Sequence, residues 1–430
     1  MTNKTDGSRG EFVKSTLDNG LRVVTCEMPH TRSVSISVFV GVGSRYESDE
    51  QAGTSHLIEH LLFKGTELRP SPGDITGTIE ATGGVINAGT EQEMTTYWCT
   101  VVESHFLESL DLMIDMLRCS VFRPEDIERE RMVVIDELGM LDDYPNSKVD
   151  ALIDDMLWPK HPLGRDVGGT KESVSAITRD MMLEFMALHY SPSNIVLSVA
   201  GNLTHDGVVR EVTRLCGDWP AAESQEWTRF DHVQSEPQVR LEYRKTEQAH
   251  LSIALPGVPV NHPGQYPLDL LSIVLGEGMS SRLFMEVRER LGLAYDVHSG
   301  VTHFQDCGAF VIDAGVDPKR LYDAVRTILD QVDGVRDGVP EEELEKAKGL
   351  IEGRLLLRME DSRAVSSWMG TQELLLGDTF GTDLIIERVK SVRADDVRKV
   401  ANEVLVGQRL NLAVVGPFRS GRRLERILTL

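Results

Sequence analysis

The segment His56-Leu57-Ile58-Glu59-His60 places two imidazoles and a carboxylate at a spacing that suits a metal site. Residues four apart share one face of a helix, so His56 and His60 can bind the same cation. Two neutral imidazoles and one carboxylate typically hold Zn²⁺ and leave a fourth position for water. Glu59 then lies beside that water and can act as its general base. Two core histidines without a metal are the alternative, so a third ligand is needed.

A second helix supplies a carboxylate of the right kind. The run Pro124-Glu125-Asp126 is typical of a helix start, and apolar residues then recur at 3-4 spacing from Ile127 onward. Glu130 and Glu137 fall on this otherwise apolar stripe, where carboxylates need a cation or hydrogen-bond donors. We therefore predict Glu137 as the third zinc ligand and Glu130 as a carboxylate that supports the ligands. A half-buried stripe whose glutamates both reach solvent is the alternative.

The boundaries of the metal-binding helix can also be predicted. Thr54-Ser55 can cap its N-terminus, and Gly65 can end it. The residues between the two histidines and beyond them are apolar, which indicates burial. Burying imidazoles and a carboxylate in such surroundings is costly without a compensating partner, and a metal would be one.

The chain consists of two related halves. Residues 172–201 match residues 387–416 at a single shift, 387 − 172 = 215. Each copy has the pattern of an amphipathic helix, a turn and an alternating strand that ends in glycine. The segment Gly217 to Gln238 is rich in Pro, Ser, Glu and Trp and marks the boundary. We predict an α+β fold with two duplicated domains, 1–220 and 221–430, each a largely antiparallel sheet with helices packed on one face.

The composition excludes several classes of function. The formal net charge of −23 disfavours nucleic acid or an anionic membrane as the main partner. The five cysteines form no CxxC pair, which argues against a thiolate zinc site and favours a reduced, cytoplasmic location. Residues 1–14 are polar and lack the apolar core of a secretory signal. No apolar run approaches the roughly 20 residues needed to span a bilayer.

These motifs resemble the pitrilysin/insulinase family of zinc peptidases, whose inverted signature is His-x-x-Glu-His. The runs His56–Thr66 and Glu130–Glu137 carry the resemblance, with Glu137 on the family's third zinc ligand and Glu130 on its supporting acid. The resemblance covers nearly the whole chain and is strongest to short bacterial members, which are similar to mitochondrial processing peptidase subunits. It implies a zinc endopeptidase that cleaves extended, unstructured peptides with Glu59 as general base.

The resemblance also implies substrate-binding residues. The run Gly83–Ala88 resembles the strand that lines the family's cleft, so Asn87 and Ala88 are expected to bind the peptide by β-augmentation. Arg288 and Tyr295 match an arginine–tyrosine pair that binds the substrate backbone or the developing oxyanion. Without the resemblance, a helix with a surface arginine and a core tyrosine would be the simpler interpretation.

Relatives of this kind pair into dimers, so the resemblance implies a homodimer with one Zn²⁺ per chain. Two alternatives remain open. One is a heterodimer in which a related chain supplies substrate recognition, and the other is a non-catalytic subunit that binds peptides or supports assembly.

Overall fold

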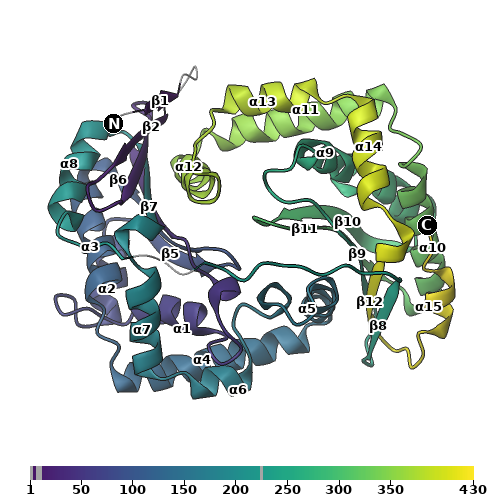
Figure 1. Ribbon diagram of the computed structural model, residues 1–430, viewed down its shortest axis with the longest axis horizontal. Helices are drawn as coiled ribbons and strands as arrows, with labels where there is room; N and C mark the ends of the chain where they lie inside the picture. Colours follow the sequence, from purple (N-terminus) through teal and green to yellow (C-terminus); the bar gives the residue numbers. More distant parts are fainter. Residues whose placement is uncertain (1–2, 6–11, 223–225) are drawn as a thin grey trace. The chain divides into compact units, whose positions relative to one another are not determined.

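A computed structural model of the protein describes residues 3–5, 12–222 and 226–430 (Figure 1). The chain divides into two compact units. Unit 1 contains residues 1–138, 166–228 and 354–385, and unit 2 contains residues 139–165, 229–353 and 386–430. Much of the N-terminal stretch 1–14 and residues 223–225 of the predicted boundary segment lie outside the described residues.

Unit 1 contains a seven-stranded sheet in the order β1-β2-β3-β7-β4-β6-β5. All neighbours are antiparallel except the parallel pair β3 and β7. The strands are β1 (Asn3–Thr5), β2 (Phe12–Thr16), β3 (Arg22–Glu27), β4 (Ser33–Val40), β5 (Val85–Thr90), β6 (Thr95–Val102) and β7 (Ile195–Gly201). The interior strand β4 directs Val34, Ile36 and Val38 into the main core, as the two-residue period of a strand requires.

Helices cover this core face of the unit 1 sheet. They are α1 (Thr54–Leu62), α2 (Pro72–Glu80), α3 (Phe106–Cys119), α4 (Pro124–Asp143), α6 (Lys171–Ala176), α7 (Arg179–His189) and α8 (His205–Cys216). The final residues of α4, from Gly139 onward, belong to unit 2. The buried side of α4 includes Ile127 and Val134, as the 3-4 spacing predicts.

One helix from the second half of the sequence, α12 (Ser362–Leu376), covers the opposite face of the unit 1 sheet. This interface is polar for a buried one. The Ser366 hydroxyl lies 2.9 Å from the Ser37 hydroxyl, and the Ser198 hydroxyl donates to the Ser366 carbonyl oxygen at 2.7 Å. The helix approaches so closely that a β-carbon added at Gly370 would lie 2.0 Å from the Phe39 ring, which explains the glycine.

Unit 2 contains a five-stranded sheet in the order β10-β11-β9-β12-β8, antiparallel except for the pair β12 and β8. Its strands are β8 (Gln238–Tyr243), β9 (Ala249–Pro256), β10 (Ala294–His303), β11 (Gly308–Val316) and β12 (Asn411–Gly416). Its other helices are α9 (Gln265–Gly276), α10 (Leu321–Gly334), α11 (Glu341–Arg358, whose last residues lie in unit 1), α13 (Thr382–Ser391, which also spans both units), α14 (Ala394–Val404) and α15 (Arg422–Ile427). A helix from the first half of the sequence, α5 (Pro145–Leu157), packs on β9 and β12.

Short helical turns connect these elements. The 3-10 turns are η1 (Ser44–Tyr46), η2 (Glu103–His105), η3 (Pro162–Gly164), η4 (Pro192–Asn194), η6 (Pro318–Arg320) and η7 (Gly407–Arg409), and η5 (Phe284–Arg290) is a π-helix.

Within the described part of the chain, no helix is both long and apolar enough to cross a membrane.

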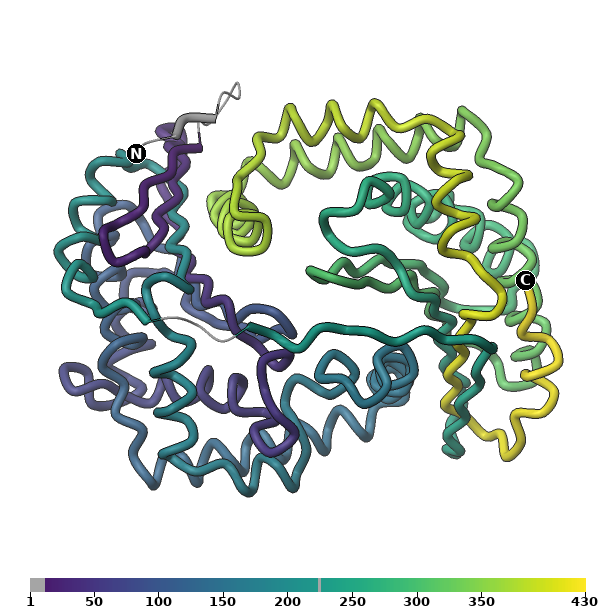
Figure 2. The backbone as a smooth tube through the Cα atoms, in the orientation of Figure 1, coloured from purple at the N-terminus to yellow at the C-terminus, as the bar shows by residue number. Residues whose placement is uncertain are grey.

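The structure confirms the duplicated α+β fold with two largely antiparallel sheets. Helix α14 follows α7 at the predicted shift, 394 − 179 = 215, and the terminal glycines of β7 and β12 obey it too, 416 − 201 = 215. Helices α5 and α12 correspond at a similar shift, 362 − 145 = 217. Each belongs to the unit that is built mainly from the other half of the sequence, a path that can be followed by colour in Figure 2.

Candidate metal centre

Helix α1, which carries His56 and His60, begins differently from the prediction. Thr54 and Ser55 do not cap it with their side chains. The buried carboxylate of Glu47 instead accepts the backbone N–H groups of Gly53 (2.8 Å) and Ser55 (2.7 Å). A carboxylate at this end of a helix is favourable because the exposed N–H groups carry partial positive charge. The helix ends at Leu62, short of Gly65.

The structure brings His56, His60 and Glu137 together. The two imidazole rings lie edge to face with centroids 4.7 Å apart. One carboxylate oxygen of Glu137 lies 3.9 Å from Nε2 of His56 and 3.7 Å from Nε2 of His60. All three ligand atoms fall within 4.8 Å of one another, and no other group of this kind occurs among the residues that the structure describes.

This set of donors fits Zn²⁺. Two imidazole nitrogens and one carboxylate oxygen are three of the four ligands of a catalytic zinc site. The pKa of His56 is lowered, first by burial and then by the neighbouring His60, which favours the neutral imidazole that binds metal. The side chain of Glu137 is 42% exposed, so the site is open to solvent on the side of this ligand.

Glu59 projects from the same helix and is held by a hydroxyl. Thr90, the last residue of β5, donates its Oγ1 hydrogen to the Glu59 carboxylate at 2.6 Å. Burial raises the pKa of Glu59, and this hydrogen bond opposes the rise. Sequence reasoning missed Thr90, because its contact with α1 depends on how β5 and the helix pack.

Glu130 is almost fully buried beneath His60. One of its carboxylate oxygens lies 3.3 Å from Nδ1 of His60, and the other lies 2.8 Å from Nζ of Lys64. A carboxylate in this position orients an imidazole whose other nitrogen binds a metal. Glu130 therefore does not reach solvent, whereas Glu137 partly does. Lys64 was also missed, although its position four residues after His60 was a signal.

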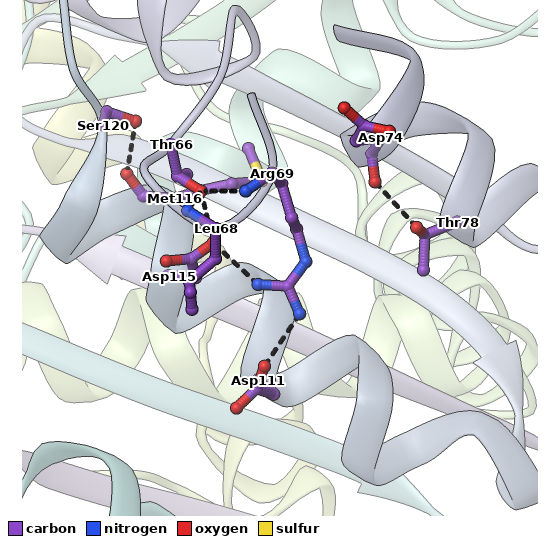
Figure 3. A network of polar contacts seen from close by, with 9 residues as sticks. All are labelled: Thr66, Leu68, Arg69, Asp74, Thr78, Asp111, Asp115, Met116 and Ser120. Atoms are coloured by element: carbon purple, nitrogen blue, oxygen red, sulfur yellow. Dashed lines mark hydrogen bonds and ion pairs between the residues drawn. The ribbon is translucent and has the colours of Figure 1, made fainter. Parts of the chain in front are cut away.

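The loop that follows α1 is fixed to α3 by a network of polar contacts (Figure 3). The Arg69 guanidinium donates to Asp115 at 2.7 Å and to Asp111 at 2.8 Å. The Thr66 hydroxyl also donates to Asp115, at 2.6 Å, and accepts the backbone N–H of Arg69 at 2.8 Å. The Asp115 side chain is only 5% exposed, so its charge is compensated by these donors.

Asn87 and Ala88 lie on β5, the edge strand of the unit 1 sheet. Within the described residues, β5 pairs with β6 along one side only. The Asn87 side chain is exposed and accepts the Ala88 backbone N–H at 2.8 Å. An edge strand of this kind can accept an extended peptide as an additional strand.

Arg288 and Tyr295 lie in unit 2, on η5 and β10. The Arg288 guanidinium carbon lies 4.7 Å from the centroid of the Phe284 ring and 5.2 Å from that of Tyr295. Tyr295 is 75% exposed, so the interpretation as a core tyrosine is wrong. Tyr295 also lines a cavity of about 350 Å³ within unit 2, together with His298 and Asp313.

Comparisons with known proteins find relatives that match nearly the whole chain. Residues 22–171 match the family model described as insulinase (peptidase family M16), and residues 176–350 match the model described as peptidase M16 inactive domain. An uncharacterized zinc protease of Streptomyces coelicolor is 37% identical over 417 residues, which cover 95% of this chain and 90% of that protein. The uncharacterized zinc protease YmxG of Bacillus subtilis is 34% identical over 403 residues, 94% of this chain and 97% of that protein.

Solved structures share the fold. A protease from Helicobacter pylori superposes with a TM-score of 0.89 at 22% identity, covering 95% of this chain and all of that one. A chain of complex III2 from Candida albicans superposes with a TM-score of 0.83 at 19% identity, covering 97% and 99% of the two chains. At such low identity these matches establish the fold alone.

Proposed function

Because the chain belongs to the insulinase family of peptidases, family M16, we propose that it is a zinc-dependent endopeptidase that cleaves extended, unstructured peptides. The observation that supports the proposal is that the candidate ligand atoms of His56, His60 and Glu137 all lie within 4.8 Å of one another, close enough to share one ion. Glu59 projects from the helix that carries the two histidines.

The ligands leave a position for water, and each neighbouring residue has a distinct task. A zinc ion in such a site supplies Lewis acidity, which activates water and polarises a carbonyl group. Glu59 takes the proton of the attacking water and delivers it to the leaving amine. Thr90 holds the Glu59 carboxylate in one orientation. Glu130 orients the ring of His60 so that Nε2 is presented to the metal.

The substrate is bound mainly through its backbone. Asn87 and Ala88 on the edge strand β5 hold the peptide in extended form by pairing with its backbone. Recognition of this kind depends on the backbone conformation of the peptide more than on its side chains. Arg288 and Tyr295 are the proposed substrate-binding pair, because a half-buried guanidinium and an exposed phenol can both donate hydrogen bonds to carbonyl oxygens or to a developing oxyanion. In the variant Y295F, kcat should therefore fall more than KM changes if the phenol acts on the oxyanion.

The decisive experiment compares E59Q with the wild type on a quenched, unstructured peptide. E59Q should bind zinc with unchanged stoichiometry and lose turnover by about 10²- to 10⁴-fold, the usual contribution of a general base. The matched control is E108Q, which makes the same change on an exposed part of α3, where the side chain of Glu108 is 59% exposed. Wild-type turnover in E59Q would refute the proposed role.

The alternatives can be tested with the isolated chain. We propose a homodimer located in the cytoplasm, with no role for a membrane or nucleic acid. Chelator-sensitive hydrolysis by the purified chain, at a mass of two copies, would support the homodimer. Zinc binding without hydrolysis would favour a heteromeric peptidase, and neither property would favour a non-catalytic peptide-binding or assembly subunit.

A further inference from the structure

The carboxylate of Glu130 bridges two residues from one short stretch of chain. His60 lies near the end of α1, and Lys64 follows one turn further along. The two side chains approach different oxygens of Glu130: Nδ1 of His60 lies 3.3 Å from Oε2, and Nζ of Lys64 lies 2.8 Å from Oε1. Both oxygens of the carboxylate are therefore occupied by groups from the same segment.

The three side chains differ in their access to water. The side chain of Glu130 is 5% exposed, that of His60 is 17% exposed, and that of Lys64 is 25% exposed. A carboxylate this deeply buried keeps its charge only with a cation or several donors beside it. The Lys64 ammonium is such a cation, and it holds one carboxylate oxygen so that the other stays directed at His60.

We propose that Lys64 is a positioning residue of the zinc site. By fixing Glu130, it sets the ring of His60 so that Nδ1 donates to the carboxylate and Nε2 is presented to the metal. This inference rests on the proposed function, and it assigns a role to a residue that neither touches the substrate nor binds the ion. Mutation of a residue that is hydrogen-bonded directly to a metal ligand, as Glu130 is to His60, commonly costs about 10- to 100-fold in metal affinity. Lys64 acts on such a residue, so we expect an effect at the lower end of this range.

The other candidate ligand, His56, lacks the kind of support that Glu130 gives to His60. Nδ1 of His56 is buried and has no hydrogen-bond partner among the described residues. No hydrogen bond from Nδ1 therefore holds the ring of His56. Of the two imidazoles, His60 is the one held through its second nitrogen, and Lys64 completes that support.

The test measures zinc affinity directly, by competition with a chromophoric chelator, and so does not depend on peptidase activity. K64M should weaken zinc binding by about tenfold, and K64R, which keeps the charge, should restore it to within about threefold. The control K148M removes a lysine of unit 2 that has the same 25% exposure and that pairs with Asp142 at 2.6 Å and with Glu242 at 3.6 Å. It should leave the zinc affinity unchanged.

A double-mutant cycle shows whether Lys64 acts through Glu130. In an E130Q background, K64M should cause little further loss of zinc affinity, because the group that it positions is already changed. Unchanged affinity in K64M, equal losses in both backgrounds, or a K64M chain that does not fold without metal would each overturn the inference. A wild-type chain that binds no zinc overturns the proposed function itself. A chain that binds zinc but cleaves no peptide overturns only the self-sufficient homodimeric peptidase, and the inference on Lys64 stands.

Discussion

Removing Arg69 should destabilise unit 1 through one buried charge. In the variant R69M, two ion pairs of the loop after α1 are lost, at 2.8 Å to Asp111 and at 2.7 Å to Asp115. Their surroundings differ: the side chain of Asp111 is 40% exposed, and that of Asp115 is 5% exposed. Thr66 would still donate to the buried carboxylate, but the cation that compensates its charge would be gone.

Losing the ion pair with Asp115 should cost more free energy than losing the pair with Asp111, because Asp115 is buried and Asp111 is not. The exposed pair with Asp111 contributes about 0.5 kcal/mol, because water screens it. Breaking a buried pair by removing one partner costs about 3–5 kcal/mol, and the Thr66 hydroxyl lowers this figure here. We therefore expect R69M to lower the free energy of unfolding of unit 1 by about 2–3 kcal/mol, and D111N to lower it by no more than about 1 kcal/mol.

Urea unfolding followed by tryptophan fluorescence can measure these effects. Of the five tryptophans, only Trp158 lies in unit 2, so the signal reports mainly on unit 1. The informative control is R69M/D115N, in which the uncompensated charge is removed as well, and it should be more stable than R69M alone. A double variant that is less stable than R69M, or equal losses in R69M and D111N, would refute the reasoning.

Three further predictions follow from other contacts. The variant E137Q should weaken zinc binding by at least about 100-fold in chelator competition while leaving the fold intact by circular dichroism, since a ligand is lost; unchanged affinity would exclude Glu137 as a ligand. G370A should destabilise unit 1 by about 1–2 kcal/mol in urea unfolding, because overlap with Phe39 outweighs the helix preference of alanine, and F39L/G370A should recover part of the loss. Burial lowers the pKa of His189 to about 4 from 6.5, so the unfolded chain binds the proton more readily and stability should fall as pH decreases from 6.5 toward 4. H189Q should flatten this dependence, and parallel pH profiles for the two proteins would contradict the assignment.

Spacing along the chain predicted what lies on a single element. The four-residue separation of His56 and His60 places both rings on one side of α1, and the seven-residue separation of Glu130 and Glu137 places both carboxylates on one side of α4. The fold class followed from the repeat, because two segments that match at a constant shift adopt the same helix–turn–strand path.

Contacts between distant elements could not be predicted in this way. Thr90 meets Glu59 across 31 residues of sequence, and Glu130 meets Lys64 only because α4 passes beneath α1. The predicted N-terminal cap of α1 was wrong for a related reason. Thr54 and Ser55 are of the types that usually cap helices, but Gly53 occupies the N-cap position and its carbonyl oxygen accepts the backbone N–H of Leu57 at 3.0 Å. Both residues therefore lie inside the helix, and Glu47 accepts the N–H groups of Gly53 and Ser55.

The placement of α12 also has a consequence for biosynthesis. The last strand of the unit 1 sheet to be synthesised, β7, ends at Gly201. The helix that covers the second face of this sheet, α12, is complete only at Leu376. Until that helix leaves the ribosome, Phe39 and the serines of β4 on that face lack their partner. A nascent chain released at the end of the first half would carry the three proposed zinc ligands, while one face of its sheet would still be uncovered. Chaperones or another nascent copy could bind to that exposed face.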